Sequence, residues 1–143
     1  MIDAAQTRIE PQALEELPHD WPQQLADGLK SDYLVGYDAY LDEAHVWFSA
    51  NQHDAVQVPL TALIDVILDD MTNDLIGFVV RQFAEIALTV SPRWERFVVQ
   101  DDTSGGPRFS EDIPMTPIRQ LSSNVPGEVI VRTLTRATQL IAA

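Results

Sequence analysis

The sequence predicts an α+β domain in which helices from the N- and C-terminal segments pack on an antiparallel sheet of about four strands. The first observation is a pair of apolar, β-rich runs, Ile64–Leu68 and Leu75–Val80, joined by a polar hexapeptide. Asn73 stands where such a turn needs a residue that tolerates positive φ. The second observation is a similar pair, Tyr33–Tyr37 and His45–Ser49. The third is apolar spacing typical of helices near both ends of the chain.

The central pair has a helical alternative. Asn73 and Gly77 are both unfavourable in a helix interior, and Val, Ile and Phe dominate the two runs, so we favour a hairpin. In the hairpin, Gly77 falls inside the return strand, where glycine marks a bulge or a close approach of another backbone segment. The residues that instead recur at helical spacing are Leu60, Ile64, Ile67, Met71, Leu75 and Phe78.

One or two short helices are expected between Glu10 and Lys30. Pro11 suits a first helical position, Pro18 separates two pieces, and Asp20 is a plausible N-cap for the second piece. That second piece carries an apolar stripe at spacings of four, formed by Trp21, Leu25 and Leu29.

The strand His45–Ser49 has two partly apolar faces. Side chains alternate along a strand, so Val46 and Phe48 share one face, while His45 and Trp47 share the other. This pattern is typical of a strand that is covered on one side and touches a helix or a partner subunit on the other.

Beyond the two strand pairs, the sequence predicts a loop, more helix and a linker. Asn51–Gln57 is a polar loop by composition, and Ala84–Val90 predicts a short helix. Ser91-Pro92 is a suitable start for a further helix that carries Trp94, Phe97 and Val98. Residues 100–107, QDDTSGGP, predict a linker.

The last stretch is irregular and then helical. Residues 108–126 are rich in Pro and Ser, and Glu128–Ala142 then predicts a helix. A strand through Val129, Val131 and Thr133 is the alternative. The helical face would be formed by Ile130, Leu134, Ala137 and Ile141.

The bulk composition limits the class of protein. A chain of 143 residues has the length of one domain, and we expect residues 1–143 to form one, with a helical segment (1–32), a β core (33–83) and a helical or irregular segment (84–143). The absence of cysteine excludes disulfides, thiolate catalysis and cysteine-based zinc sites. No secretory signal or membrane-spanning run is present, so we expect a soluble, cytoplasmic protein without membrane association.

The charge is strongly acidic, with a net charge of −13 from 22 acids and nine bases. A nucleic-acid binder would have to confine these few bases to one face, so we expect no nucleic-acid partner. Acidity also favours solubility, and a basic protein partner is the more specific interpretation.

The two strand pairs together resemble domain of unknown function 2283, a small bacterial family. The likeness covers roughly residues 34–83 and includes a Tyr-Asp, an Asp four residues later, an alternating aromatic strand, and a second hairpin that ends in an apolar pair and Gly. Val79 departs from the polar residue that is frequent in the family. The matching residues are Tyr37-Asp38, Asp42, His45-Val46-Trp47-Phe48, Asp69, Thr72, Leu75-Ile76-Gly77 and Phe78.

The resemblance implies an antiparallel sheet of about four strands that often self-associates, with no established activity and no known catalytic residue. Some relatives look like partners of small toxins, which suits an acidic protein without catalysis. The family-motif residues with a structural or interaction role are then Tyr37, Asp38, Asp42, Val46, Phe48, Asp69 and Gly77.

Few residue patterns suggest chemistry. The histidines His19, His45 and His53 lack the spacing that puts two ligands on one helix face. Asp38 and Asp42 flank the first turn and are suited to acid–base work only where an apolar setting separates their pKa values. Turn acids that bond their own backbone explain them equally well.

The acidic hexapeptide is also a candidate cation site. Asp69, Asp70 and Asp74 offer oxygen ligands, but Leu75 and Arg81 stand where a calcium loop needs Gly and Glu. We expect a solvated turn, no metal and no cofactor. Gly105-Gly106 lacks the lysine and helix of a phosphate loop.

The sequence therefore favours a non-catalytic interaction module that self-associates, as a homodimer, and is open to a basic protein partner of the toxin-neutralising type. The interaction candidates are Trp47, Asp70 and Asp74. The alternative is a small-ligand-binding protein or enzyme with a cleft between the sheet and the C-terminal part. Such a cleft would be lined by Arg81, Arg93 or Arg119.

Overall fold

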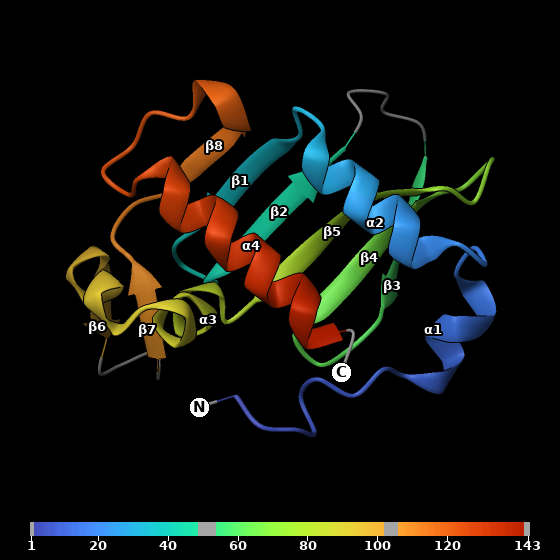
Figure 1. Ribbon diagram of the computed structural model, residues 1–143, viewed down its shortest axis with the longest axis horizontal. Coiled ribbons are helices and arrows are strands. Elements are labelled where there is room, and N and C mark those ends of the chain that lie inside the picture. Colours follow the sequence, from blue (N-terminus) through green and yellow to red (C-terminus); the bar gives the residue numbers. More distant parts are fainter. Residues whose placement is uncertain (1, 49–53, 102–105, 142–143) are drawn as a thin grey trace.

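The computed structural model describes residues 2–48, 54–101 and 106–141, and in this part of the chain helices lie on one side of a six-stranded sheet (Figure 1). All neighbouring strands are antiparallel, in the order β3-β4-β5-β2-β1-β8. The strands are β1 (Leu34–Asp38), β2 (Glu43–Trp47), β3 (Ala55–Pro59), β4 (Ile64–Asp69), β5 (Leu75–Arg81) and β8 (Ile113–Pro117).

The central hairpin is confirmed as the pair β4 and β5. Asn73 has the predicted left-handed conformation, with φ at 62°, and its N–H donates to the carbonyl oxygen of Asp69 at 2.8 Å. The carboxylate of Asp69 accepts from the N–H groups of Met71 and Thr72 at 2.8 and 3.2 Å. The hexapeptide thus satisfies its own backbone groups, which explains why a turn forms here and a helix does not.

The sheet is larger than the predicted four strands. We expected a loop over Asn51–Gln57, but Ala55–Gln57 belong to β3, which pairs with β4. Residues 49–53 lie outside the described part, and with them the end of the predicted strand His45–Ser49. Only Val58 is buried in β3, and its alternation with Val56 is too short to predict a strand.

The other added strand, β8, comes from the segment predicted to be irregular. It pairs with β1 between Leu34 and Pro117 and between Val35 and Thr116. Proline is tolerated there because an edge strand needs only part of its N–H groups for pairing.

Two helices, α2 (Trp21–Lys30) and α4 (Gly127–Ile141), lie across the same face of the sheet, and α1 (Pro11–Glu16) precedes them (Figure 1). The predicted C-terminal helix is therefore confirmed. Gly28 of α2 lies directly against the ring of Phe48, where a β-carbon would overlap it. The buried residues of α4 are Val129, Ile130, Thr133, Leu134, Ala137 and Ile141.

The predicted N-caps are present by position only. Asp20 precedes α2, but its carboxylate accepts from the amide of Gln24 at 2.8 Å and caps no backbone N–H. Ser91 likewise makes no side-chain cap.

The C-terminal part differs from the expectation at two places. A 3-10 helix (Pro92–Phe97) follows α3 (Phe83–Val90), and Val98 already begins a strand. The predicted linker contributes to a small second sheet of β6 (Val98–Asp101) and β7 (Gly106–Phe109). These two strands are held together by backbone hydrogen bonds, which require no apolar pattern in the sequence.

An aromatic cluster joins this end of the molecule to the sheet. The ring centroid of Tyr37 lies 5.8 Å from Phe83 and 5.3 Å from Phe109, and these two rings are 5.7 Å apart. All three side chains are buried. The cluster therefore fixes α3 and β7 to β1. In the described ranges, no helix combines the length and the apolar character needed to cross a lipid bilayer.

Candidate functional site

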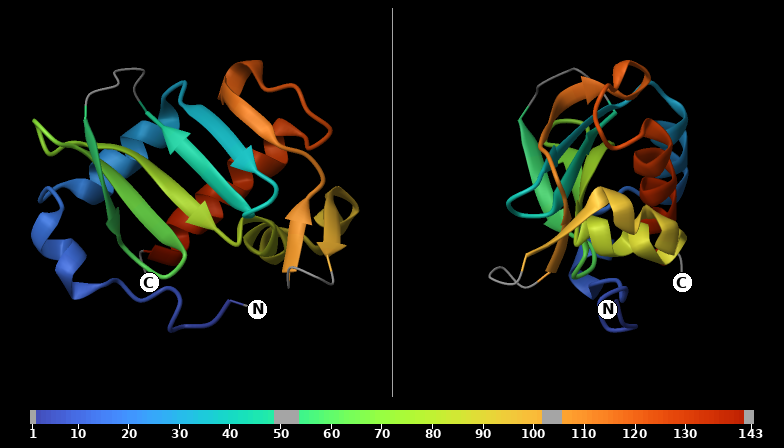
Figure 2. Two further views of the ribbon diagram at one scale, coloured as in Figure 1. Left: turned by 180° about the vertical axis from the view of Figure 1, so that it is seen from behind. Right: turned by 90° about the vertical axis from the view of Figure 1, so that its left-hand side faces the viewer.

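The first candidate is the face of the sheet that α2 and α4 leave uncovered. In the left view of Figure 2 this face points toward the viewer. The strands lie in front of the helices, and no described element covers them. Cross-strand pairing places Ile67, Gly77, Trp47 and Leu34 in one row across β4, β5, β2 and β1. We call this surface the open sheet face.

Trp47 lies on the open sheet face, as the alternation of side chains along this strand predicts. Its neighbours Val46 and Phe48 point to the helical side, where Val46 is fully buried and Phe48 packs against the core. Trp47 pairs with Gly77 of β5. A β-carbon on Gly77 would lie less than 3.0 Å from the carbonyl oxygen of Val46, so the predicted close approach is confirmed.

The apolar side chains of the open sheet face form a group apart from the main core. Ile67 and Val79 are 4% and 1% exposed, yet neither belongs to the core cluster under the helices. Met115 of β8 is 45% exposed, and its sulfur lies 3.3 Å from the position of a β-carbon on Gly36. The face is thus partly apolar and only partly shielded by its own side chains.

A hydrogen-bonded ion pair crosses the same face. The Arg81 guanidinium donates from Nη1 to Asp65 Oδ1 at 2.8 Å and from Nη2 to Oδ2, and Gln57 Nε2 donates to Oδ2 at 2.6 Å. Burial raises the pKa of Asp65, but these hydrogen bonds and the charge of Arg81 outweigh it and hold the pKa below its ordinary value. Glu43 Oε2 lies 3.7 Å from Arg81 Nε.

Asp38 and Asp69 each accept hydrogen bonds from backbone N–H groups of their own turn. The Asp38 carboxylate accepts from the N–H groups of Tyr40 and Leu41 at 2.9 and 3.1 Å, as Asp69 does in the second turn. Asp70 and Asp74 are exposed in the second turn, away from the row that contains Trp47. The structure therefore does not bring the three interaction candidates together.

The motif pair Tyr37 and Asp42 links the first hairpin to the C-terminal part. The Tyr37 hydroxyl donates to Asp42 Oδ1 at 2.6 Å and accepts from the N–H of Phe109 at 2.9 Å. The same Asp42 oxygen accepts from the N–H of Ala84 at 3.1 Å, in the first turn of α3. Burial, opposed by these hydrogen bonds, raises the pKa of Asp42 to about 6.

The second candidate is a cleft of about 700 Å³ beside this pair. It lies between the first hairpin turn, the start of α3 and β7, and so between the sheet and the C-terminal part. Two of its residues, Asp42 and Gln82, have left-handed backbone angles, with φ at 53° and 52°. The charged and amide side chains that line it are Gln6, Asp42, Glu43, Arg81, Gln82, Glu85 and Arg108.

The sequence anticipated this cleft only in part. Arg81 lines it as expected, whereas Arg93 and Arg119 do not. Gln82 and Arg108 were missed, because neither belongs to a periodic or paired pattern. Positive φ at glutamine is uncommon and costs free energy, and such strain gathers at functional sites.

Replacing Asp42 by asparagine is expected to stabilise the protein at pH 7. The carboxyl pKa of about 6 exceeds the ordinary value of 3.8, so ionisation is costlier in the folded state. This group makes the free energy of unfolding fall as pH rises from about 4 to about 6 and then stay level. Asparagine accepts the same bonds and tolerates positive φ, so the gain should be about 1–2 kcal/mol.

Urea denaturation between pH 4 and pH 8 measures this effect. Asp42→Asn should flatten the decline seen in the wild type, whereas Asp42→Ala should destabilise the protein because it removes the bonds to Tyr37 and Ala84. An asparagine variant that keeps the wild-type pH profile would contradict the assignment.

Metal ligation finds no support in the described residues, where no three His, Asp or Glu side chains gather as a metal site. His53 lies outside the described part. His45 Nε2 lies 3.6 Å from Glu43 Oε1 on the open sheet face.

Comparison with family models, curated proteins and solved structures gives no match for this chain. The functional argument therefore rests on the open sheet face and the cleft.

Proposed function

We propose that the protein is a non-catalytic interaction module that forms a homodimer through the open sheet face. The observation that carries this proposal is a six-stranded sheet with α2 and α4 on one face and no described element over the other (Figure 2). A sheet stabilises itself by burying an apolar face, and here the second face also bears apolar side chains that water still reaches, the half-buried Trp47 and the exposed Met115. A second copy of the same face offers the same row of side chains.

The charge distribution favours this face for self-association. Two chains that each carry −13 repel one another, so contact is least costly where charges are already paired. Asp65 and Arg81 are bonded to each other on this face. Its central row of Ile67, Gly77 and Trp47 carries no charge.

The size of the face indicates a weak dimer. Six strands about 4.8 Å apart and about 20 Å long span roughly 580 Å² per copy. A symmetric pair would bury about 1,200 Å² in total, at the lower end of specific protein interfaces. We therefore expect dissociation at micromolar concentration.

Replacing Trp47 by glutamate is expected to abolish the dimer, because it places a charge in the centre of each face. Analytical ultracentrifugation across about 1–200 µM would detect a change from a concentration-dependent dimer to a monomer. Met115→Glu, at the margin of the same face, should weaken the dimer less.

The matched control is Val131→Glu on α4, an apolar-to-acid change at a side chain that is 40% exposed on the side of the molecule opposite the open sheet face (Figure 1). It should leave the dimer intact. Circular dichroism verifies that each variant is folded. A wild type that stays monomeric at 200 µM (about a hundredfold above the expected Kd) or a folded Trp47→Glu dimer would refute the proposal.

The resemblance to domain of unknown function 2283 agrees with self-association and remains a prediction. The basic protein partner is a further prediction of the acidic charge, with Asp70 and Asp74 exposed for contact. The cleft supports the second candidate, a small-ligand site, because a carboxyl group with a raised pKa lies in a cavity of ligand size.

A further inference from the structure

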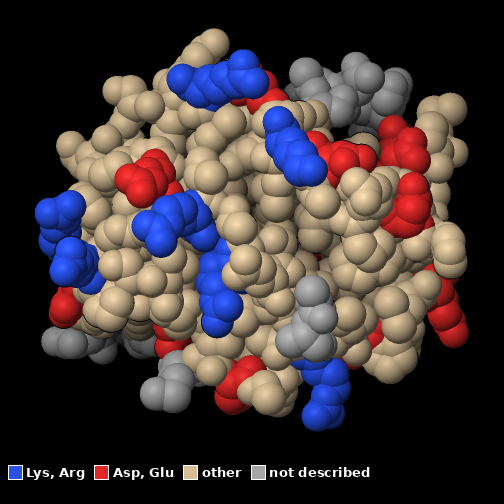
Figure 3. Space-filling model, in the orientation of Figure 1, with Lys and Arg blue, Asp and Glu red and all other residues tan. Residues whose placement is uncertain are grey.

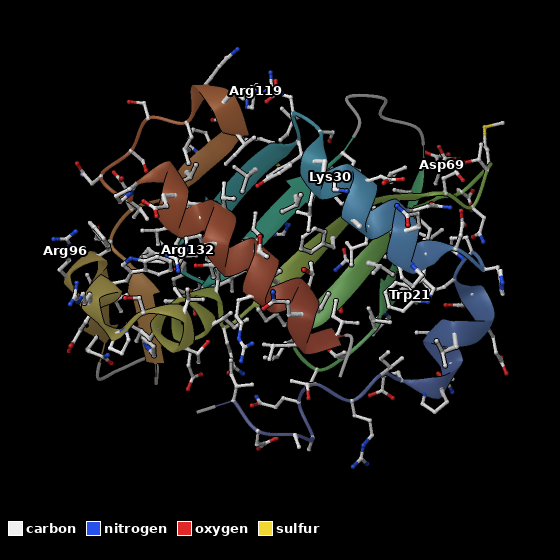
Figure 4. All side chains as sticks on the ribbon, viewed as in Figure 1. Trp21, Lys30, Asp69, Arg96, Arg119 and Arg132 are labelled. Atoms are coloured by element: carbon white, nitrogen blue, oxygen red, sulfur yellow. The ribbon has the colours of Figure 1, made fainter. Side chains whose placement is uncertain are left out.

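The few basic residues are unevenly distributed over this acidic protein. Figure 3 shows blue side chains along α4 and around the 3-10 helix that follows α3, on the side of the molecule opposite the open sheet face. Figure 4 places Arg132 on α4 and Arg96 on the 3-10 helix at this end, whereas Asp69 lies at the far end. The helical side therefore has a basic end despite the net charge of −13.

A groove of about 370 Å³ lies within this basic end, between the last turn of α3 and α4. Two of its residues are arginines, and none of the described residues that line it is an acid. Arg132 and Arg136 are one helical turn apart, so both side chains leave the same face of α4. The lining residues are Thr89, Val90, Arg132, Thr135, Arg136 and Gln139.

The ring of Trp94 holds the guanidinium of Arg132 in position. The guanidinium lies over this ring, 5.2 Å from the ring centroid, and Trp94 itself is 9% exposed. Stacking on an aromatic ring leaves the edge N–H groups of a guanidinium free to donate. The Glu128 carboxylate lies 3.6 Å away at an exposed position, and such a pair contributes little free energy, so an anion can displace it.

The hydroxyl groups of the threonines that line the groove already donate to backbone carbonyl oxygens. Donation to a bound anion is therefore left to the other lining side chains. Thr89 donates to the carbonyl oxygen of Ile86 at 2.6 Å, and Thr135 donates to that of Val131 at 3.0 Å. The groups that can donate to an anion are then the two guanidinium groups and the Gln139 amide. Paired arginines match the oxygens of a phosphate group in a bidentate arrangement.

We propose that this groove binds a phosphate group carried by a small molecule or by a phosphorylated side chain. The volume suits a small ligand. A long polyanion such as nucleic acid fits the surface poorly, because phosphates beyond the groove would meet the acidic remainder of the protein. The site lies on the helical side, so it is independent of the dimer through the open sheet face.

The test is a calorimetric titration of the full chain with inorganic pyrophosphate at low salt. We expect saturable binding, and the double variant Arg132→Gln/Arg136→Gln should weaken it at least about tenfold, because charge-assisted hydrogen bonds are lost. The matched control is Lys30→Gln/Arg119→Gln, which removes the same charge from the same side outside the groove (Figure 4). It should change the affinity less than about twofold.

A parallel titration with a phosphoserine peptide and its unphosphorylated form separates the two sources of the phosphate. Tighter binding of the phosphopeptide than of pyrophosphate assigns the site to a protein partner, and the reverse assigns it to a small molecule. Equal losses in the control and groove variants would overturn the proposal as general electrostatics. No saturable binding, or tighter binding of a single-stranded oligonucleotide than of either probe, would overturn it too.

Discussion

Gly77→Ala is expected to destabilise the protein by about 3 kcal/mol or more. The added β-carbon would lie less than 3.0 Å from the backbone oxygen of Val46, and backbone cannot move aside as a flexible side chain does. Gly77 belongs to β5, and Val46 belongs to β2. These two strands are the only link between the halves β3-β4-β5 and β2-β1-β8 in the described sheet.

Chemical denaturation followed by far-UV circular dichroism measures this loss. The matched control is Gly106→Ala in β7, where an added β-carbon meets no atom within 4 Å. The control should change the free energy of unfolding by less than about 0.5 kcal/mol. Similar losses at the two positions would mean that strand propensity, and not the close approach of β5 and β2, explains the effect.

Arg81→Met is expected to cost about 3 kcal/mol at pH 7, because it leaves the buried Asp65 carboxylate without its charged partner. Asp65 is 4% exposed, and Arg81 supplies two of its hydrogen bonds. Methionine keeps an apolar stem of similar length, so the loss reports on the charge and not on packing. The control Arg119→Met breaks an exposed pair with Asp32 and should cost less than about 0.5 kcal/mol.

The pH dependence gives a second readout. In the wild type the pKa of Asp65 lies below its ordinary value, so its contribution is present above that value and is lost as pH falls. Without Arg81, burial dominates and raises the Asp65 pKa, so the variant should regain stability relative to the wild type on acidification.

Asp65→Asn in the Arg81→Met background should restore part of the stability, because asparagine leaves no buried charge. A double variant no more stable than Arg81→Met at pH 7 would contradict this account.

Local signals in the sequence were sufficient for the elements with strong side-chain requirements. Asn73 marked a turn because few residues accept positive φ, and the apolar runs beside it marked β4 and β5. The alternation in β2 placed Trp47 opposite Val46 and Phe48. The apolar spacing of α4 marked its buried face.

The strands β3 and β8, which were not predicted, place no such requirements on their side chains. In β3 only Val56 and Val58 alternate as apolar residues, and two prolines interrupt β8, so neither segment is a strong strand signal. Both are held by backbone hydrogen bonds to β4 and β1. The predicted linker could contribute to β6 and β7 for the same reason, since N–H and C=O groups are present in almost every residue.

The sequence by itself determined the α+β class, the central hairpin, the terminal helices and the side of β2 on which Trp47 lies, because these depend on φ preferences and on periodicity along one segment. Only the tertiary structure decided that the described sheet has six strands and that no described element covers one of its faces (Figure 2). Only it brought Asp42 to Arg108 in the cleft and Arg132 to Thr89 in the groove. Contacts between distant segments depend on how whole elements pack, and no pattern within either segment encodes its partner.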